Sequence, residues 1–100
     1  MKGLLITPEE KKIEEIDINN HAEITRLIGF DTIISDEINE QGDRLFFDEE
    51  CFIRGIDGRF QLDSLIPVAG IGIVVGAISN TELKDRTISK DELVSRVKFL

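Results

Sequence analysis

The chain has 100 residues, 41% of them hydrophobic, and a formal net charge of −8 at pH 7, which fits one globular domain with a modest core. The surplus of acids argues against ordinary DNA or RNA binding, because a phosphate backbone would be repelled. A single cysteine excludes an intrachain disulfide and suits a reducing, cytoplasmic location. The longest apolar run is shorter than the ~20 residues that a membrane-spanning helix needs, so we expect no membrane association.

The first predicted element is a short strand over residues 2–6, where aliphatic residues follow one another. Residues 7–18 admit two interpretations. Their opening Thr-Pro-Glu-Glu is typical of a capped helix, whereas the alternation at Ile16 and Ile18 is typical of a strand. We predict a polar turn over 7–12 followed by a strand.

A helix is predicted over residues 20–28. Asn20 and Glu23 have the spacing of a capping box, and Gly29 provides a C-terminal stop. The chain's one histidine, His21, lies at the start of this helix. It has no second histidine as a partner for metal binding or catalysis, so we assign it a surface or capping role.

The middle of the chain contains a predicted hairpin. Residues 31–38 are rich in β-branched side chains and predict one strand, and residues 44–47 predict its partner. Between them, residues 39–43 form a loop in which Gly42 is available for a positive φ. A further short strand is predicted over 59–62, after an Asp-Gly turn signal.

Residues 65–78 are predicted to contain the central strand of the sheet. The segment is too rich in glycine and β-branched residues for a helix, and its near-continuous apolar character indicates that both faces are covered. Its glycines should mark close packing, a bulge or a bend. Gly70 and Gly72 resemble a dinucleotide-binding fingerprint only superficially, because no βαβ unit precedes them.

A second helix is predicted over residues 89–100, after a short polar segment, 80–88, that is the nearest feature to a linker. Ser89 and Glu92 have the spacing of a capping box. The helix is expected to pack on the sheet through an apolar stripe. The stripe consists of Leu93, Val94, Val97 and Leu100.

Together these elements predict a single α+β domain over residues 1–100. We expect a mixed or mainly antiparallel sheet of about four to six strands with two helices packed on it. The expected core consists of Ile24, Leu27, Ile28, Ile33, Phe46, Ile71, Ile73, Val75, Val94 and Val97.

Most of the negative charge lies in residues 29–63, which hold ten acids and three bases, a net charge of −7. We predict a partner-binding acidic surface at Asp43, Asp48, Glu49 and Glu50, and a protein with a basic surface as the partner. A plain solvated face is the alternative. The same carboxylates also admit weak divalent-cation binding. However, their spacing matches an EF-hand loop poorly, and we assign no metal or cofactor.

Motifs of catalysis are missing from the sequence, which contains no G-x-S-x-G, P-loop, H-E-x-x-H or C-x-x-C pattern. Three acids precede Cys51, and their charge disfavours a reactive thiolate. We therefore expect Cys51 to be a small core residue. These observations favour a protein that is not an enzyme.

The order of the elements resembles the family called domain of unknown function 3846, small proteins of bacteria, phages and plasmids. The resemblance rests on I-x-P-E-E at 6–10, the helix ending at Gly29, NEQGDRL at 39–45, the Asp-Gly turn at 57–58 and IPVAGIGIVVG at 66–76. The chain departs from the family where it has FFDEECFIRG in place of an L-P-x-N-R-like segment. The resemblance also favours the strand over the helix in residues 7–18, and it implies a cytosolic accessory protein of a mobile element.

Three classes of function fit these residues. The favoured one is a non-enzymatic accessory protein that binds a partner through its acidic middle third. The second is a DNA-mimicking inhibitor of a DNA-binding enzyme, although Arg44, Arg54 and Arg59 interrupt the acids that would imitate phosphates. The third is a small metabolite-binding domain or enzyme with a pocket near Gly70 and Gly72.

Overall fold

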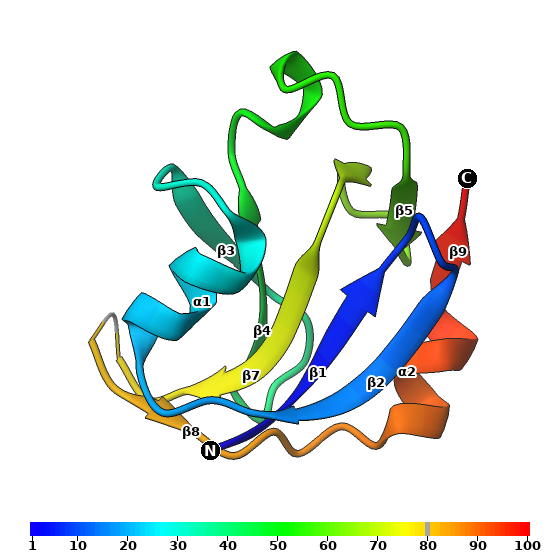
Figure 1. The fold of residues 1–100 in the computed structure, drawn as a ribbon. Coiled ribbons are helices and arrows are strands. Elements are labelled where there is room, and N and C mark those ends of the chain that lie inside the picture. Colours follow the sequence, from blue (N-terminus) through cyan, green and yellow to red (C-terminus); the bar gives the residue numbers. More distant parts are fainter. Residues whose placement is uncertain (80) are drawn as a thin grey trace.

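The computed structural model describes residues 1–79 and 81–100. Within them it has two antiparallel sheets, two α-helices and one 3₁₀ turn (Figure 1). In chain order the elements are β1 (Lys2–Thr7), β2 (Lys12–Asp17), α1 (His21–Ile28), β3 (Ile33–Glu37), β4 (Asp43–Asp48), η1 (Cys51–Ile53), β5 (Arg59–Leu62), β6 (Val68–Ala69), β7 (Gly72–Ala77), β8 (Leu83–Lys84), α2 (Lys90–Arg96) and β9 (Val97–Phe99).

The larger sheet has the strand order β2-β1-β7-β4-β3, with β8 added alongside β7. The smaller sheet has the order β6-β5-β9. Every strand pairing in the described part of the chain is antiparallel. The predicted α+β fold class is therefore confirmed.

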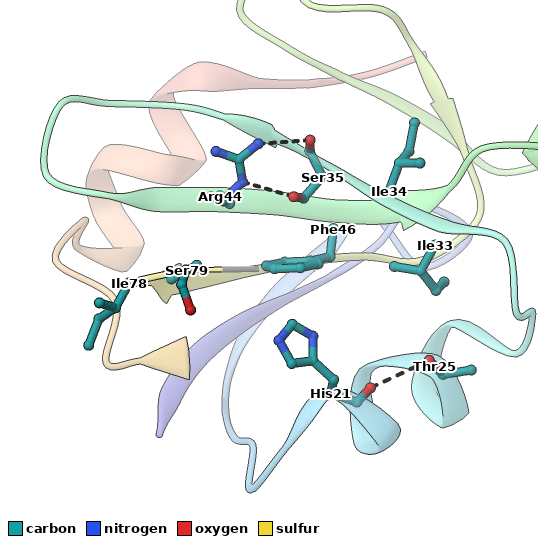
Figure 2. Close-up of a pocket in the computed structure, with 10 residues that line it drawn as sticks. His21, Thr25, Ile33, Ile34, Ser35, Arg44, Phe46, Ile78 and Ser79 are labelled. Carbon is teal, nitrogen blue, oxygen red and sulfur yellow. Dashed lines mark hydrogen bonds between the residues drawn. The ribbon is translucent and has the colours of Figure 1, made fainter. Parts of the chain in front are cut away.

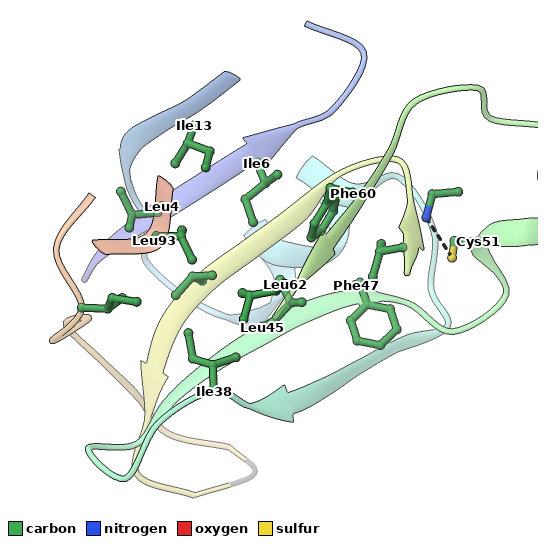
Figure 3. Packing of buried hydrophobic residues seen from close by; sticks show 14 residues of the cluster. Leu4, Ile6, Ile13, Ile38, Leu45, Phe47, Cys51, Phe60, Leu62 and Leu93 are labelled. Carbon is green, nitrogen blue, oxygen red and sulfur yellow. Dashed lines mark hydrogen bonds between the residues drawn. The ribbon is translucent and has the colours of Figure 1, made fainter. Parts of the chain in front are cut away.

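Strand β7 lies at the centre of the larger sheet, and its side chains enter a different core on each face. Val74 belongs to a cluster that includes Phe60 of β5 and Leu93 of α2 (Figure 3). Ile73 and Val75 belong to a second cluster, which α1 completes with Ile24 and Ile28. All three β7 residues are fully buried. The prediction of a central strand covered on both faces is thus confirmed.

The local signals at the start of the chain predicted its structure correctly. Residues 8–11 form a turn, and β2 pairs along the whole length of β1, as the turn-and-strand interpretation requires. The side chain of Asn20 accepts a hydrogen bond from the backbone N–H of Glu23 at 3.1 Å. Gly29 ends α1 with a φ of +92°. Each of these features depends on neighbours in sequence.

Besides the predicted central strand β7, residues 65–78 contain a second short strand, β6, which belongs to the smaller sheet. Gly70 adopts a φ of +83°, which few other residues tolerate. The chain turns there from β6 in the smaller sheet to β7 in the larger one. Gly72 is a close-packing glycine, since a Cβ atom on it would lie 2.5 Å from Cζ of Phe60.

The helix expected over residues 89–100 ends at Arg96, and the chain continues as strand β9. Ser89 caps the helix as predicted, accepting a hydrogen bond from the backbone N–H of Glu92. Beyond Arg96, Val97 and Phe99 pair with strand β5. Pairing with β5 therefore replaces the last helical turn that the local sequence predicted.

Two of the predicted core residues are exposed: Leu27 to 39% and Val94 to 50%. In α1 only Ile24 and Ile28 are buried, and Leu27 lies to one side of the helix face that they share. In α2 only Leu93 is buried. Of the remaining predictions, Ile24, Ile28, Phe46, Ile73 and Val75 are buried, while Ile33, Ile71 and Val97 are partly buried.

The short polar segment before α2 is tied to the domain. Residue 80 lies outside the described residues, but Leu83 and Lys84 form β8, and Ile88 is buried in the core beside α2. Neither of the helices in residues 1–79 and 81–100 has the length and apolar content needed to cross a membrane.

Candidate functional site

Asp43, at the start of β4, is completely buried. Its carboxylate accepts four hydrogen bonds: from the backbone N–H (2.8 Å) and hydroxyl (2.6 Å) of Thr87, the backbone N–H of Ile88 (2.8 Å) and the side chain of Asn39 (2.7 Å). Burial raises the pKa of Asp43, but these donors stabilise the ionised form more, so its pKa lies below the ordinary value of 3.8. Asp43 thus joins the β3–β4 hairpin to the segment before α2.

Asp48, at the other end of β4, is only 2% exposed. It accepts hydrogen bonds from Nε of Arg54 at 3.0 Å, from the hydroxyl of Thr32 and from the backbone N–H of Glu50 at 3.0 Å. Burial raises the pKa of Asp48, but these hydrogen bonds and the charge of Arg54 outweigh it and hold the pKa below its ordinary value. The guanidinium of Arg54 also lies 4.2 Å from the ring centroid of Phe30.

The predicted acidic surface is therefore wrong for two of its four residues. Asp43 and Asp48 are buried acceptors that hold the fold together, since a buried carboxylate is stable only when hydrogen-bonded or paired. Glu49 and Glu50 are exposed as predicted. Glu50 forms an ion pair with Arg54 at 3.4 Å. Glu49 forms no ion pair with any described residue.

Residues 49–53, which we call the projecting turn, combine these two glutamates with exposed apolar side chains. Phe52 is 48% exposed and Ile53 is 76% exposed. Between them and the glutamates, Cys51 is buried, and its sulfur accepts a hydrogen bond from the backbone N–H of Ala69 at 3.4 Å. The prediction that Cys51 is a core residue is confirmed. In Figure 1 the turn forms the outermost loop at one end of the molecule.

A second feature is a cleft of about 450 Å³ beside α1, which we call the β3–β4 cleft (Figure 2). Strands β3 and β4 provide Ser35, Arg44 and Phe46 to its lining, and α1 provides His21 and Thr25. The remaining lining residues are Ile33, Ile34, Ala77, Ile78 and Ser79. The cleft exists because α1, with only eight residues, covers just part of that face of the sheet.

The surface or capping role predicted for His21 is not what the structure shows. Asn20 is the cap, and His21 is the first helical residue. Its imidazole is half-buried and contacts the ring of Phe46 edge to face, with 5.9 Å between the ring centroids. Nε2 is buried and has no hydrogen-bond partner among the described residues. His21 therefore forms part of the cleft wall.

The pocket expected near Gly70 and Gly72 corresponds to a small cavity of about 210 Å³. Gly70 and Ile71 line it together with Ile28, Ile56 and residues 7–9. Gly72 does not, because it is buried against Phe60. Within residues 1–79 and 81–100, no group of three or more His, Cys, Asp or Glu side chains is arranged to hold a metal ion.

The chain matches no protein-family model, no curated protein and no solved structure. The resemblance to the domain of unknown function 3846 thus stays a prediction.

Sequence reasoning missed both the apolar part of the projecting turn and the cleft. Large apolar side chains such as Phe52 and Ile53 are normally expected in a core, and no local pattern reveals that they are exposed here. One part of the cleft follows from the hairpin register. Ser35 is opposite Phe46, and Arg44 is two residues before Phe46 on the same strand, so Ser35 and Arg44 lie on the same face of the sheet. The position of α1 over that face, in contrast, is a property of the whole fold.

Proposed function

We propose that this chain is a non-enzymatic accessory domain that binds a protein partner through the projecting turn. The observation that carries this proposal is the pair Phe52 and Ile53, adjacent large apolar side chains that are 48% and 76% exposed. Exposed apolar groups with a polar rim are typical of protein-binding surfaces. The two glutamates that precede them supply such a rim.

The projecting turn is held rigidly from beneath. Within the turn, the side chain of Cys51 is buried in the core. Directly after the turn, Arg54 donates hydrogen bonds to Asp48 at 3.0 Å and to the hydroxyl of Thr32 at 3.1 Å. A turn fixed in this way loses little conformational entropy when a partner binds. Asp48 therefore serves the proposed interface indirectly, because it positions the residues that project.

The chemistry of the turn indicates the partner: an apolar pocket bordered by lysine or arginine side chains. Glu49 and Glu50 would accelerate association with such a surface, and salt would weaken this effect. The resemblance to a family of mobile elements supports an accessory role in a bacterial cytoplasm. A DNA-mimicking inhibitor has less support, because Asp43 and Asp48 are not available to imitate phosphates.

The test is capture of the partner from a bacterial lysate by the immobilised protein at low and high salt. Replacing both Phe52 and Ile53 by serine should abolish capture while leaving the fold intact. Val94→Ser is the matched control, because Val94 is 50% exposed on α2, and it should capture the partner normally. Glu49→Gln should weaken capture mainly at low salt.

Equal capture by the double variant and the unaltered protein would remove the projecting turn from the proposal. A variant that neutralises Asp43 and Asp48 is unsuitable, since it would disrupt the fold before it altered a surface. Circular dichroism of each variant establishes that a loss of capture does not come from unfolding.

A further inference from the structure

Arg44 is a half-buried arginine without a carboxylate partner. The protein contains 20 acids and only six arginines, and Arg26, Arg54, Arg86 and Arg96 each form an ion pair. Among residues 1–79 and 81–100, no carboxylate lies within 4.0 Å of Arg44, although Glu37 is directly opposite it in the β3–β4 register. The charge of Arg44 is therefore not neutralised by an ion pair, although the protein as a whole is acidic.

Ser35 fixes the guanidinium in place. Nε of Arg44 donates to the hydroxyl of Ser35 at 2.8 Å, and Nη2 donates to its backbone carbonyl at 3.0 Å (Figure 2). Nη1 has no acceptor in the described part of the chain. An arginine held along one side keeps its remaining donors oriented for a planar anion.

Around Arg44 the cleft wall mixes polar and apolar side chains, and polar groups make up most of its exposed surface. The β3–β4 cleft has a volume of about 450 Å³, within the roughly 300–1,000 Å³ of pockets that hold small molecules. Phe46, Ile33 and Ile78 offer apolar contact, and Ser79 offers a hydroxyl group. The cleft therefore offers Arg44 to an anionic end of a small molecule, and Phe46 and Ile78 to an apolar part of its body.

We propose that the β3–β4 cleft binds a small carboxylate, whose anionic group pairs with Arg44 and whose apolar body packs on Phe46 and Ile78. A monoanion is favoured over a phosphate dianion because the site has one arginine and the protein carries a net charge of −8. The site is separate from the projecting turn, and neither proposal depends on the other.

The experiment is an amide chemical-shift titration of the whole protein with 4-phenylbutyrate, with the neutral 4-phenylbutyramide and with inorganic phosphate. The carboxylate should shift amides of Ser35, Arg44 and Ala77 and bind roughly tenfold more tightly than the amide, because charge-assisted hydrogen bonds are the stronger ones. N-acetyl-leucylphenylalanine distinguishes a peptide C-terminus from a free acid: tighter binding than that of 4-phenylbutyrate assigns the carboxylate to a peptide. Equal binding of acid and amide, tighter binding of phosphate, shifts confined to other regions or no shifts at all would overturn the proposal.

Arg44→Lys keeps the charge but loses the planar fork, and it should weaken carboxylate binding by roughly tenfold. Arg59→Lys is the matched control, because Arg59 also lacks an ion pair with the described residues but is exposed on β5. Unchanged binding by Arg44→Lys, or an equal loss in both variants, would contradict the assignment. If Arg44→Lys fails to fold, the titration of the unaltered protein still decides.

Discussion

Replacing Asp43 by asparagine is expected to destabilise the domain by about 3 kcal/mol, a large part of the roughly 5–15 kcal/mol that stabilises a protein of this size. Asp43 is completely buried and accepts four hydrogen bonds, two of them from backbone N–H groups that can only donate. The change preserves the size of the side chain, so the loss reports on hydrogen bonding and charge alone.

The magnitude follows from how the donors divide between the two carboxylate oxygens. Oδ1 accepts from the backbone N–H of Thr87, and Oδ2 accepts from Asn39, the hydroxyl of Thr87 and the N–H of Ile88. An asparagine oxygen in the Oδ2 position keeps three donors, but its amide group then faces the N–H of Thr87. One buried donor left unsatisfied costs about 1–3 kcal/mol, and weaker hydrogen bonds to a neutral acceptor add about 1 kcal/mol or more.

Urea denaturation at pH 7 measures this loss, and thermal unfolding should show a Tm lower by roughly 12–24 °C. Asp57→Asn is the control, because Asp57 is exposed and its replacement should change stability by less than about 0.5 kcal/mol. The reasoning fails if the two variants have the same stability.

Acid titration tests the same carboxylate independently. The pKa of Asp43 is lower in the folded protein than the ordinary value of 3.8, so its contribution to stability is present above pH 3.8 and is lost as the pH falls through the folded pKa. Asp48 has a pKa shifted in the same direction. Asp43→Asn should therefore lose less stability than the unaltered protein between neutral pH and pH values below 3.8. A parallel loss in the two proteins would show that Asp43 contributes nothing to acid sensitivity.

Three further changes test the fold. Gly72→Ala places a methyl group 2.5 Å from the ring of Phe60 and should cost about 1–3 kcal/mol in urea denaturation; an unchanged midpoint would mean that the ring moves freely. Asn20→Ala removes the cap that accepts from Glu23 and should cost about 1 kcal/mol, whereas no change would mean that water replaces the cap. Removing residues 97–100 uncovers Phe60 and should cost about 2–4 kcal/mol, and a Tm equal to that of the whole chain would refute the role of β9.

The parts of the fold that the sequence predicted are those decided by neighbouring residues. Asn20 and Gly29 limit α1 through capping geometry that involves only a few positions. The β3–β4 hairpin follows from Gly42, which has a φ of +95°. In contrast, residues 97–99 become a strand because β5 lies beside them. That partner is more than 30 positions earlier in the chain, and helical spacing in the sequence carries no information about it.

The candidate site was harder to predict, because a carboxylate looks the same in the sequence whether it is exposed or buried. Asp48 and Glu49 are neighbours, yet one is 2% exposed and the other faces solvent. The difference depends on Arg54 and Thr32, which surround Asp48 only after the chain has folded. Whether a carboxylate is buried or exposed therefore depends on the hydrogen-bond donors that the fold brings to it, and not on the number of acids in the segment.

The charge of the middle third therefore has two separate effects. Asp43 and Asp48 lie at opposite ends of β4 and fix the segments around it, which makes them contributors to stability. Glu49, in contrast, is exposed to solvent near Phe52 and Ile53, where its charge is available to a partner. Because Asp48 holds the base of the projecting turn through Arg54, a substitution of Asp48 would weaken partner binding through the fold. Only substitutions at the exposed positions can separate a binding role from a structural one.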